Sequence, residues 1–144
     1  MAFVALLDAC VLVPPDVRDL LIELAYRGFY RALWSTDIMA EVRRTLVHKH
    51  AVAPEKVDSL LSSLHEAVLD PEVQGYEDLV SGLILPDPDD RHVLAAAIRG
   101  GAGVIVTANL KDFPPDSLAP YQLEAKHPDE FLVNLYDLYG SDVL

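Results

Sequence analysis

The chain has 144 residues, of which 51% are hydrophobic, so we expect a single domain over residues 1–144 with a substantial core. Its formal net charge of −12 argues against a broad basic surface, so any nucleic-acid role would have to use local chemistry such as bound cations. The sequence contains no uninterrupted apolar run long enough for a membrane helix and no basic lead-in typical of a signal peptide, which predicts a cytoplasmic protein.

The first half of the chain alternates between short apolar runs and helical patterns. Residues 3–8, FVALLD, form an apolar run closed by an acid, which is typical of a strand buried on both faces. RALWS predicts a second strand, and Ser35 or Thr36 can cap the helix that follows it. Apolar spacing predicts helices over residues 16–28, 37–50 and 54 to about 69, the first and third of them opened by prolines.

The second half continues this alternation. A short helical piece is expected over residues 75–83, and the helix that starts near Asp90 should end at Gly100 and Gly101. GVIVT predicts a buried strand and NLKDFPP a turn, while YQLEA predicts a last short strand before a terminal helix over residues 128–140. This order of elements predicts an α/β fold, a three-layer sandwich with a central, mostly parallel sheet.

Four acids occupy positions where the strands of such a sheet end or where a helix faces that edge. They are Asp8, Glu41, Asp90 and Asp112. Each has an ordinary explanation by itself, as a turn residue, a helix-start charge or a solvated flank. Together, however, carboxylates that converge at one sheet edge repel each other unless a cation neutralises them. Oxygen ligands of this kind suit Mg²⁺ or Mn²⁺.

Asp90 is the most informative of these acids. In LPDPDDRHVLAAA it begins a helical stripe whose next members, Val93, Leu94 and Ala97, are apolar. A carboxylate at the start of a buried stripe is explained if the start of the helix faces a metal cleft while the later residues pack on the sheet.

Several neighbouring side chains have weaker signals. Thr107 and Asn109 follow the last buried strand, where they could orient a ligating carboxylate or a phosphate oxygen, or could simply stabilise their own turn. We interpret His92 chiefly as a packing residue, with substrate contact as the alternative. Cys10 has no evident base partner, so we interpret it as a small packing residue.

The chain has one modest basic cluster, near the end of the helix predicted over residues 37–50. It comprises Arg43, Arg44, His48, Lys49 and His50. A solvated helix end is the main interpretation, and an edge that contacts phosphate is the alternative.

The segments LLDACVL, TDIMAEVRRTL, DPDDRHVLAAAIRGGAGVIVTANLKDFP and HPDEFL together resemble the PIN-domain ribonucleases, a family that includes the toxin subunits of VapBC toxin-antitoxin pairs. The resemblance implies an endoribonuclease that depends on Mg²⁺ or Mn²⁺, held by Asp8, Glu41, Asp90 and, as a more variable fourth acid, Asp112. Thr107 and Asn109 match polar positions near that fourth acid. The resemblance also implies an RNA substrate, an antitoxin partner and a homodimer, and related chains often continue beyond the point where this one ends.

The hypothesis is therefore hydrolysis of RNA phosphodiester bonds, leaving a 5′-phosphate and a 3′-hydroxyl. A phospho-receiver domain is an alternative, because Asp8, Thr107 and Lys111 superficially fit one, although no phosphorylatable Asp stands at a middle strand end. A haloacid-dehalogenase phosphatase would need a second acid at the position of Cys10. A catalytically weak PIN-fold module that acts through a protein partner remains the third alternative.

Overall fold

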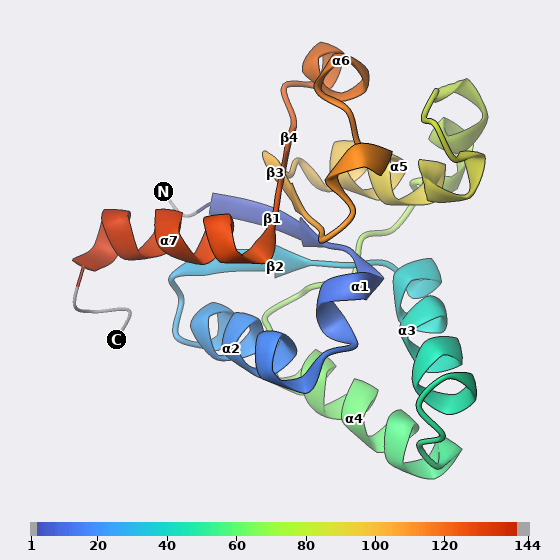
Figure 1. The fold of residues 1–144 in the computed structure, drawn as a ribbon, viewed down its shortest axis with the longest axis vertical. Coiled ribbons are helices and arrows are strands. Elements are labelled where there is room, and N and C mark those ends of the chain that lie inside the picture. Colours follow the sequence, from blue (N-terminus) through green and yellow to red (C-terminus); the bar gives the residue numbers. More distant parts are fainter. Residues whose placement is uncertain (1–2, 141–144) are drawn as a thin grey trace.

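The computed structural model describes residues 3–140, with a four-stranded sheet at its centre (Figure 1). Its strands are β1 (Phe3–Leu7), β2 (Tyr30–Leu33), β3 (Val104–Val106) and β4 (Glu124–Lys126), in the order β2-β1-β3-β4. All three neighbouring pairs are parallel, and Leu6 of β1 lies opposite Leu33 on one side and Ile105 on the other. The carboxyl ends of the strands therefore share one edge. The α/β prediction with a parallel central sheet is confirmed.

Helices flank this sheet, with α5 packed against β1 and β3 and α2 against β2. None of the helices within residues 3–140 is long and apolar enough to cross a membrane. Short 3-10 segments precede α5 and join the later elements. The seven α-helices of the described residues are α1 (Ala9–Leu12), α2 (Pro15–Tyr26), α3 (Thr36–His48), α4 (Pro54–Ala67), α5 (Arg91–Gly100), α6 (Pro115–Leu118) and α7 (Pro128–Tyr139).

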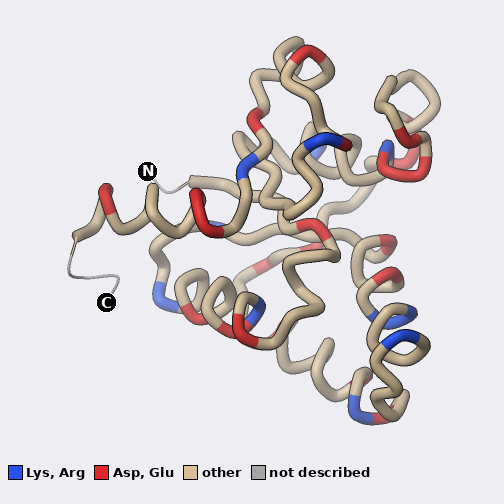
Figure 2. The backbone as a smooth tube through the Cα atoms, viewed as in Figure 1, with Lys and Arg blue, Asp and Glu red and all other residues tan. Residues whose placement is uncertain are grey.

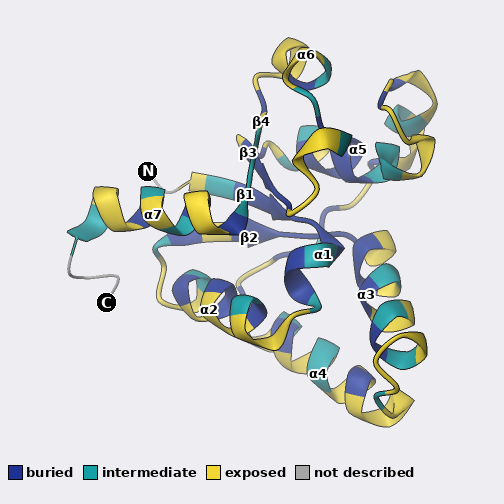
Figure 3. Ribbon diagram, viewed as in Figure 1, coloured by how far each residue is buried: buried dark blue, intermediate teal, exposed yellow. Residues whose placement is uncertain are grey.

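The helix boundaries follow local chemistry. Ser35 begins α3 because its hydroxyl accepts a hydrogen bond from the backbone N–H of Ile38 at 3.1 Å, which confirms one of the two predicted caps. Gly101 ends α5 with a φ of 70°, a left-handed conformation that glycine adopts without a steric penalty. In Figure 3 the strands are largely buried, whereas the outer faces of α2, α3 and α4 are exposed.

The core lies between the sheet and the helices that contact it. Its largest fully buried side chains include Trp34, Tyr76, Phe113 and Phe131. Trp34 also donates a hydrogen bond from its indole N–H to Nε2 of His65 at 3.2 Å. His65 therefore packs against the core through Trp34.

Two local predictions need correction. The last strand begins at Glu124, later than the predicted YQLEA segment, because residues Ala119–Tyr121 form a 3-10 turn that ends at Gln122 with a positive φ of 57°. The segment after β1 was not predicted to be helical, yet Ala9–Leu12 form α1. Four apolar residues are too few to display helical periodicity.

Candidate active site

Asp8 lies directly after β1, at the carboxyl edge of the sheet, and its side chain caps α1. The backbone N–H of Asp8 donates to the carbonyl oxygen of Val106 at 3.1 Å, which ties this turn to the end of β3. The carboxylate accepts a hydrogen bond from the N–H of Ala9 at 2.8 Å. Only 6% of Asp8 is exposed, so the fold buries an acid at the point where its two central strands end.

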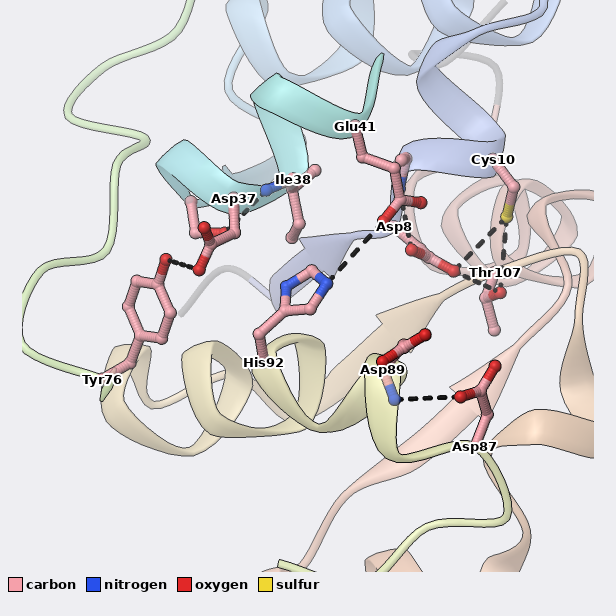
Figure 4. Close-up of polar contacts among 12 residues, drawn as sticks. Asp8, Cys10, Asp37, Ile38, Glu41, Tyr76, Asp87, Asp89, His92 and Thr107 are labelled. Atoms are coloured by element: carbon pink, nitrogen blue, oxygen red, sulfur yellow. Dashed lines mark hydrogen bonds and ion pairs between the residues drawn. The ribbon is translucent and has the colours of Figure 1, made fainter. Parts of the chain in front are cut away.

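Thr107 and Cys10 hold the Asp8 carboxylate (Figure 4). The fully buried Thr107 hydroxyl donates to Oδ2 of Asp8 at 2.9 Å, and the Cys10 thiol lies 3.5 Å from the same oxygen. Burial raises the pKa of Asp8, these two hydrogen bonds oppose the rise, and the charge of Glu41 adds to it; the net result is a pKa above the ordinary value. Asp8 is thus a carboxylate whose charge is only partly compensated.

Cys10 has more partners than the packing interpretation predicted. Its sulfur lies 3.4 Å from the Thr107 hydroxyl and accepts a hydrogen bond from the N–H of Ala108 at 3.3 Å. Burial and the nearby Asp8 carboxylate raise the pKa of the thiol to about 11. Cys10 is therefore a neutral thiol at physiological pH that joins the turn after β1 to the turn after β3.

Asp90 ends the 3-10 segment Pro88–Asp90 and occupies the N-cap position of α5. An aspartate at this position commonly accepts a hydrogen bond from the first turn of the helix, but the Asp90 side chain makes no such bond. Burial raises its pKa to about 6, assisted by the charges of Asp8, Asp87, Asp112 and Glu41 in that order. Its carboxylate therefore experiences the repulsion of four other acids.

Glu41 extends from α3 toward the start of α5. Its Oε1 lies 3.7 Å from Nε2 of His92, and the two side chains are 42% and 18% exposed. Burial disfavours the imidazolium form of His92, but the contact with Glu41 and the charges of Asp37 and Asp8 together outweigh it and raise the pKa of His92. His92 thus links α5 to α3 beside the acids, and Figure 4 shows its contact with Glu41 as a dashed line.

The two remaining predicted site residues, Asp112 and Asn109, make no side-chain hydrogen bond to the other acids in the described structure. Asp112 ends the 3-10 segment Leu110–Asp112 after β3, is partly buried, and acts on Asp90 through its charge. The exposed Asn109 joins the site through its backbone N–H, which donates to the Thr107 hydroxyl at 3.1 Å. Thr107 therefore donates to Asp8 while accepting from Asn109, so one buried hydroxyl positions both turns.

Sequence reasoning missed the role of Asp87. Its carboxylate accepts a hydrogen bond from the N–H of Asp89 at 2.9 Å, starting the 3-10 segment, and its charge raises the pKa of Asp90. The spacing of the acids in DPDD could have predicted this role, because Asp87, which caps the short turn, must lie close to Asp90, which ends it. Asp37, which accepts a hydrogen bond from the Tyr76 hydroxyl at 2.6 Å, was also missed.

The acids form an electrostatic cluster without a closed coordination sphere. Within residues 3–140, no group of three or more His, Cys, Asp and Glu side chains is arranged so that it could hold a metal ion. The chemistry of the donors nevertheless fits a hard divalent cation, because the repulsion that raises the pKa of Asp90 comes from oxygen donors alone. A cation among these carboxylates would relieve the repulsion.

Comparison with known proteins identifies related chains. Residues 4–111 match the family model described as the PIN domain. A stretch of 65 residues is 57% identical to "Putative ribonuclease VapC50" of Mycobacterium tuberculosis. The matched stretch makes up 45% of this chain and 38% of that relative, so the chain covers well under two thirds of the relative's length. The crystal structure of VapBC2 from Rickettsia felis bound to a DNA fragment from their promoter matches 87% of this chain and 98% of its own with a TM-score of 0.57. At 20% sequence identity this likeness shows the fold alone.

Proposed function

This chain belongs to the PIN domain family, and from that premise we propose that it is a metal-dependent endoribonuclease, the toxin component of a toxin-antitoxin pair. The observation that carries the proposal is the position of Asp90, which is partly buried at the N-cap of α5 without a capping hydrogen bond. Burial and the charges of four neighbouring carboxylates raise its pKa to about 6. A fold gains no stability from such repulsion, and strongly perturbed acids of this kind are typical of functional sites.

In this proposal Asp8, Asp90 and Asp112 would hold Mg²⁺ or Mn²⁺, with Glu41 as a further ligand or as a base. When bound, the cation would neutralise phosphate charge and make water more acidic. Two hydrogen bonds keep the Asp8 carboxylate oriented: Oδ2 accepts from the Thr107 hydroxyl at 2.9 Å, and Oδ1 accepts from the Ala9 N–H. Asp8 therefore cannot rotate without breaking a buried contact.

Glu41 is the proposed general base. Water attacks the phosphorus in line with the bond to the 3′ oxygen, that bond breaks, and Glu41 accepts the proton of the attacking water. The 3′ oxygen leaves and takes a proton from solvent, so the products carry a 5′-phosphate and a 3′-hydroxyl. His92, 3.7 Å from Oε1 of Glu41, positions this carboxylate from the opposite helix.

The names of the similar proteins support the wider proposal. One is named as a ribonuclease, and the other structure is a VapBC pair with promoter DNA. We therefore propose RNA as the substrate and an antitoxin protein as a partner of this chain. A homodimer and a cytoplasmic location remain predictions from the sequence.

The test is cleavage of a mixed-sequence single-stranded RNA by the purified protein with Mn²⁺, Mg²⁺ or EDTA. The essential variant is Asp90→Asn, and its matched control is Asp89→Asn. Asp89 is the adjacent acid and is exposed, and its charge is not among those that raise the pKa of Asp90. We expect metal-dependent cleavage that Asp90→Asn abolishes and Asp89→Asn retains. A wild-type protein that binds Mn²⁺ without cutting any RNA would instead support a binding module.

A further inference from the structure

A pocket of about 800 Å³ lies beside the acids, between α1, α2, α3 and α4. Glu41 and Cys10 line its inner end, so this α1–α4 groove begins at the candidate active site. Its walls are largely apolar and include Val13, Leu46 and Val57. The proposed reaction uses only the inner end of the groove, which leaves the rest of it without a role.

Cations gather at the outer part of the groove. Lys49 and Lys56 line it, and both are exposed. Glu41 is the only carboxylate among the lining residues, although the chain has 23 acids and 11 Lys and Arg residues. Figure 2 shows the Lys and Arg residues along the later turns of α3 and at the start of α4. The groove is thus locally basic in an acidic protein.

In the part of the chain that the structure describes, these two lysines form no ion pair. Other exposed cations form ion pairs, for example Arg43 with Asp58 at 2.8 Å and Arg99 with Asp78 at 3.2 Å. Within residues 3–140, neither Lys49 nor Lys56 lies within salt-bridge distance of an acid. Their charges are therefore available to an anionic molecule in the groove.

We propose that the α1–α4 groove binds the single-stranded RNA on one side of the cut site, with Lys49 and Lys56 contacting its phosphates and the apolar walls contacting its bases. This inference rests on the proposed function, and it extends it from the cut bond to the path of the strand. Phosphate contacts made by lysine are independent of sequence. The lining residues include no Phe, Tyr or Trp, so binding depends on the backbone charge more than on base stacking.

The helix geometry gives the length of RNA that is needed. Glu41 and Lys49 are both on or next to α3, and eight residues of helix correspond to roughly 12 Å along the axis. At roughly 3.4 Å per stacked nucleotide, this distance corresponds to about four nucleotides. A stacked strand that extends fewer nucleotides than this from the cut bond does not reach the lysines.

The experiment compares the double variant Lys49→Gln/Lys56→Gln with Arg31→Gln/Arg99→Gln, which removes the same charge. Arg31 and Arg99 line a small pocket together at the other end of the sheet, near the start of β2 and the end of α5. Binding of a fluorescent RNA of about 20 nucleotides is measured by anisotropy in EDTA at several salt concentrations. Cleavage of this RNA and of one of about four nucleotides is measured with Mn²⁺.

We expect the lysine variant to bind the long RNA about tenfold more weakly, with a logarithmic salt slope smaller by about 1.4, because each phosphate contact to a single strand contributes about 0.7. Its KM for the long RNA should rise with little change in kcat, and its cleavage of the short RNA should match wild type. The arginine variant should behave like wild type in each assay.

Equal binding and equal salt slopes for the two double variants would overturn the groove proposal while leaving the nuclease proposal intact. Conversely, a wild-type protein that binds RNA through the lysines but never cleaves it would support the groove and overturn the nuclease. A third result also contradicts the proposal: if wild type binds poly-glutamate through the lysines but binds no RNA, the groove accepts an acidic protein segment.

Discussion

Replacing Asp90 by Asn should abolish cleavage and at the same time stabilise the metal-free protein. Burial, assisted by the charges of Asp8, Asp87, Asp112 and Glu41, raises the pKa of Asp90 from 3.8 to about 6. A rise of this size corresponds to about 3 kcal/mol of unfavourable free energy for the charged form at neutral pH. Because Asp90 is partly exposed, solvent screening reduces this to about 1–2 kcal/mol.

The pH dependence follows from the sign of the shift. Since the folded protein holds the Asp90 proton more tightly than the unfolded chain does, this residue costs stability as the pH rises from about 4 to about 6, and the cost is full above that range. Wild type and Asp90→Asn should therefore differ at pH 7 and converge near pH 4. The same titration should weaken Mn²⁺ binding by wild type below about pH 6.

Urea unfolding in EDTA at pH 7 and at pH 4 measures the difference in free energy of unfolding between wild type and Asp90→Asn. In a thermal scan of a chain of this length, 1 kcal/mol corresponds to roughly 2–4 °C in Tm. Asp89→Asn is the control, because this exposed acid at the helix start should change stability by no more than about 0.5 kcal/mol, and in the unfavourable direction. Mn²⁺ should then stabilise wild type and leave Asp90→Asn unaffected. An Asp90→Asn protein that is no more stable than wild type at pH 7 in EDTA would refute the electrostatic reasoning.

Three further predictions concern the supports of the site. Thr107→Val removes the hydroxyl that donates to Asp8, so Mn²⁺ affinity measured by calorimetry should fall about 10-fold to 100-fold, with recovery in Thr107→Ser; unchanged affinity in the valine variant would contradict this role. Ser35→Ala removes the cap on the N–H of Ile38 and should lower the free energy of unfolding by about 1 kcal/mol in urea titrations, whereas no loss would mean that water replaces the cap. Cys10 should react with iodoacetamide at pH 8 roughly 100-fold more slowly in the folded protein than in urea, because burial raises the pKa of its thiol to about 11. Equal rates in the two states would show that the folded protein exposes a thiolate.

Much of the architecture was determined by local patterns in the sequence. The apolar run before Asp8 and the GVIVT segment predict strands buried on both faces, and strand-helix alternation predicts a parallel sheet. Because parallel strands end at one edge, the acids that follow them could be assigned to a common region before any contact was known. The DPDD and TANLKDF segments resemble the PIN family, and the family match confirms that resemblance and the predicted fold, while the assignment of the acids to one site stays a prediction.

Only the tertiary structure decided how the acids are held and what lies beside them. The hydrogen bond from Thr107 to Asp8 joins residues that are 99 positions apart, and the contact of Cys10 with Ala108 is equally remote in sequence. No local pattern encodes such contacts, because they depend on the packing of β1 against β3. The basic cluster at the end of α3 shows the same limit, since its sequence fits both a solvated helix end and a phosphate contact. The placement of Lys49 and Lys56 in one groove with Glu41 requires α3 to pack on both α1 and α4, which is a property of the whole fold.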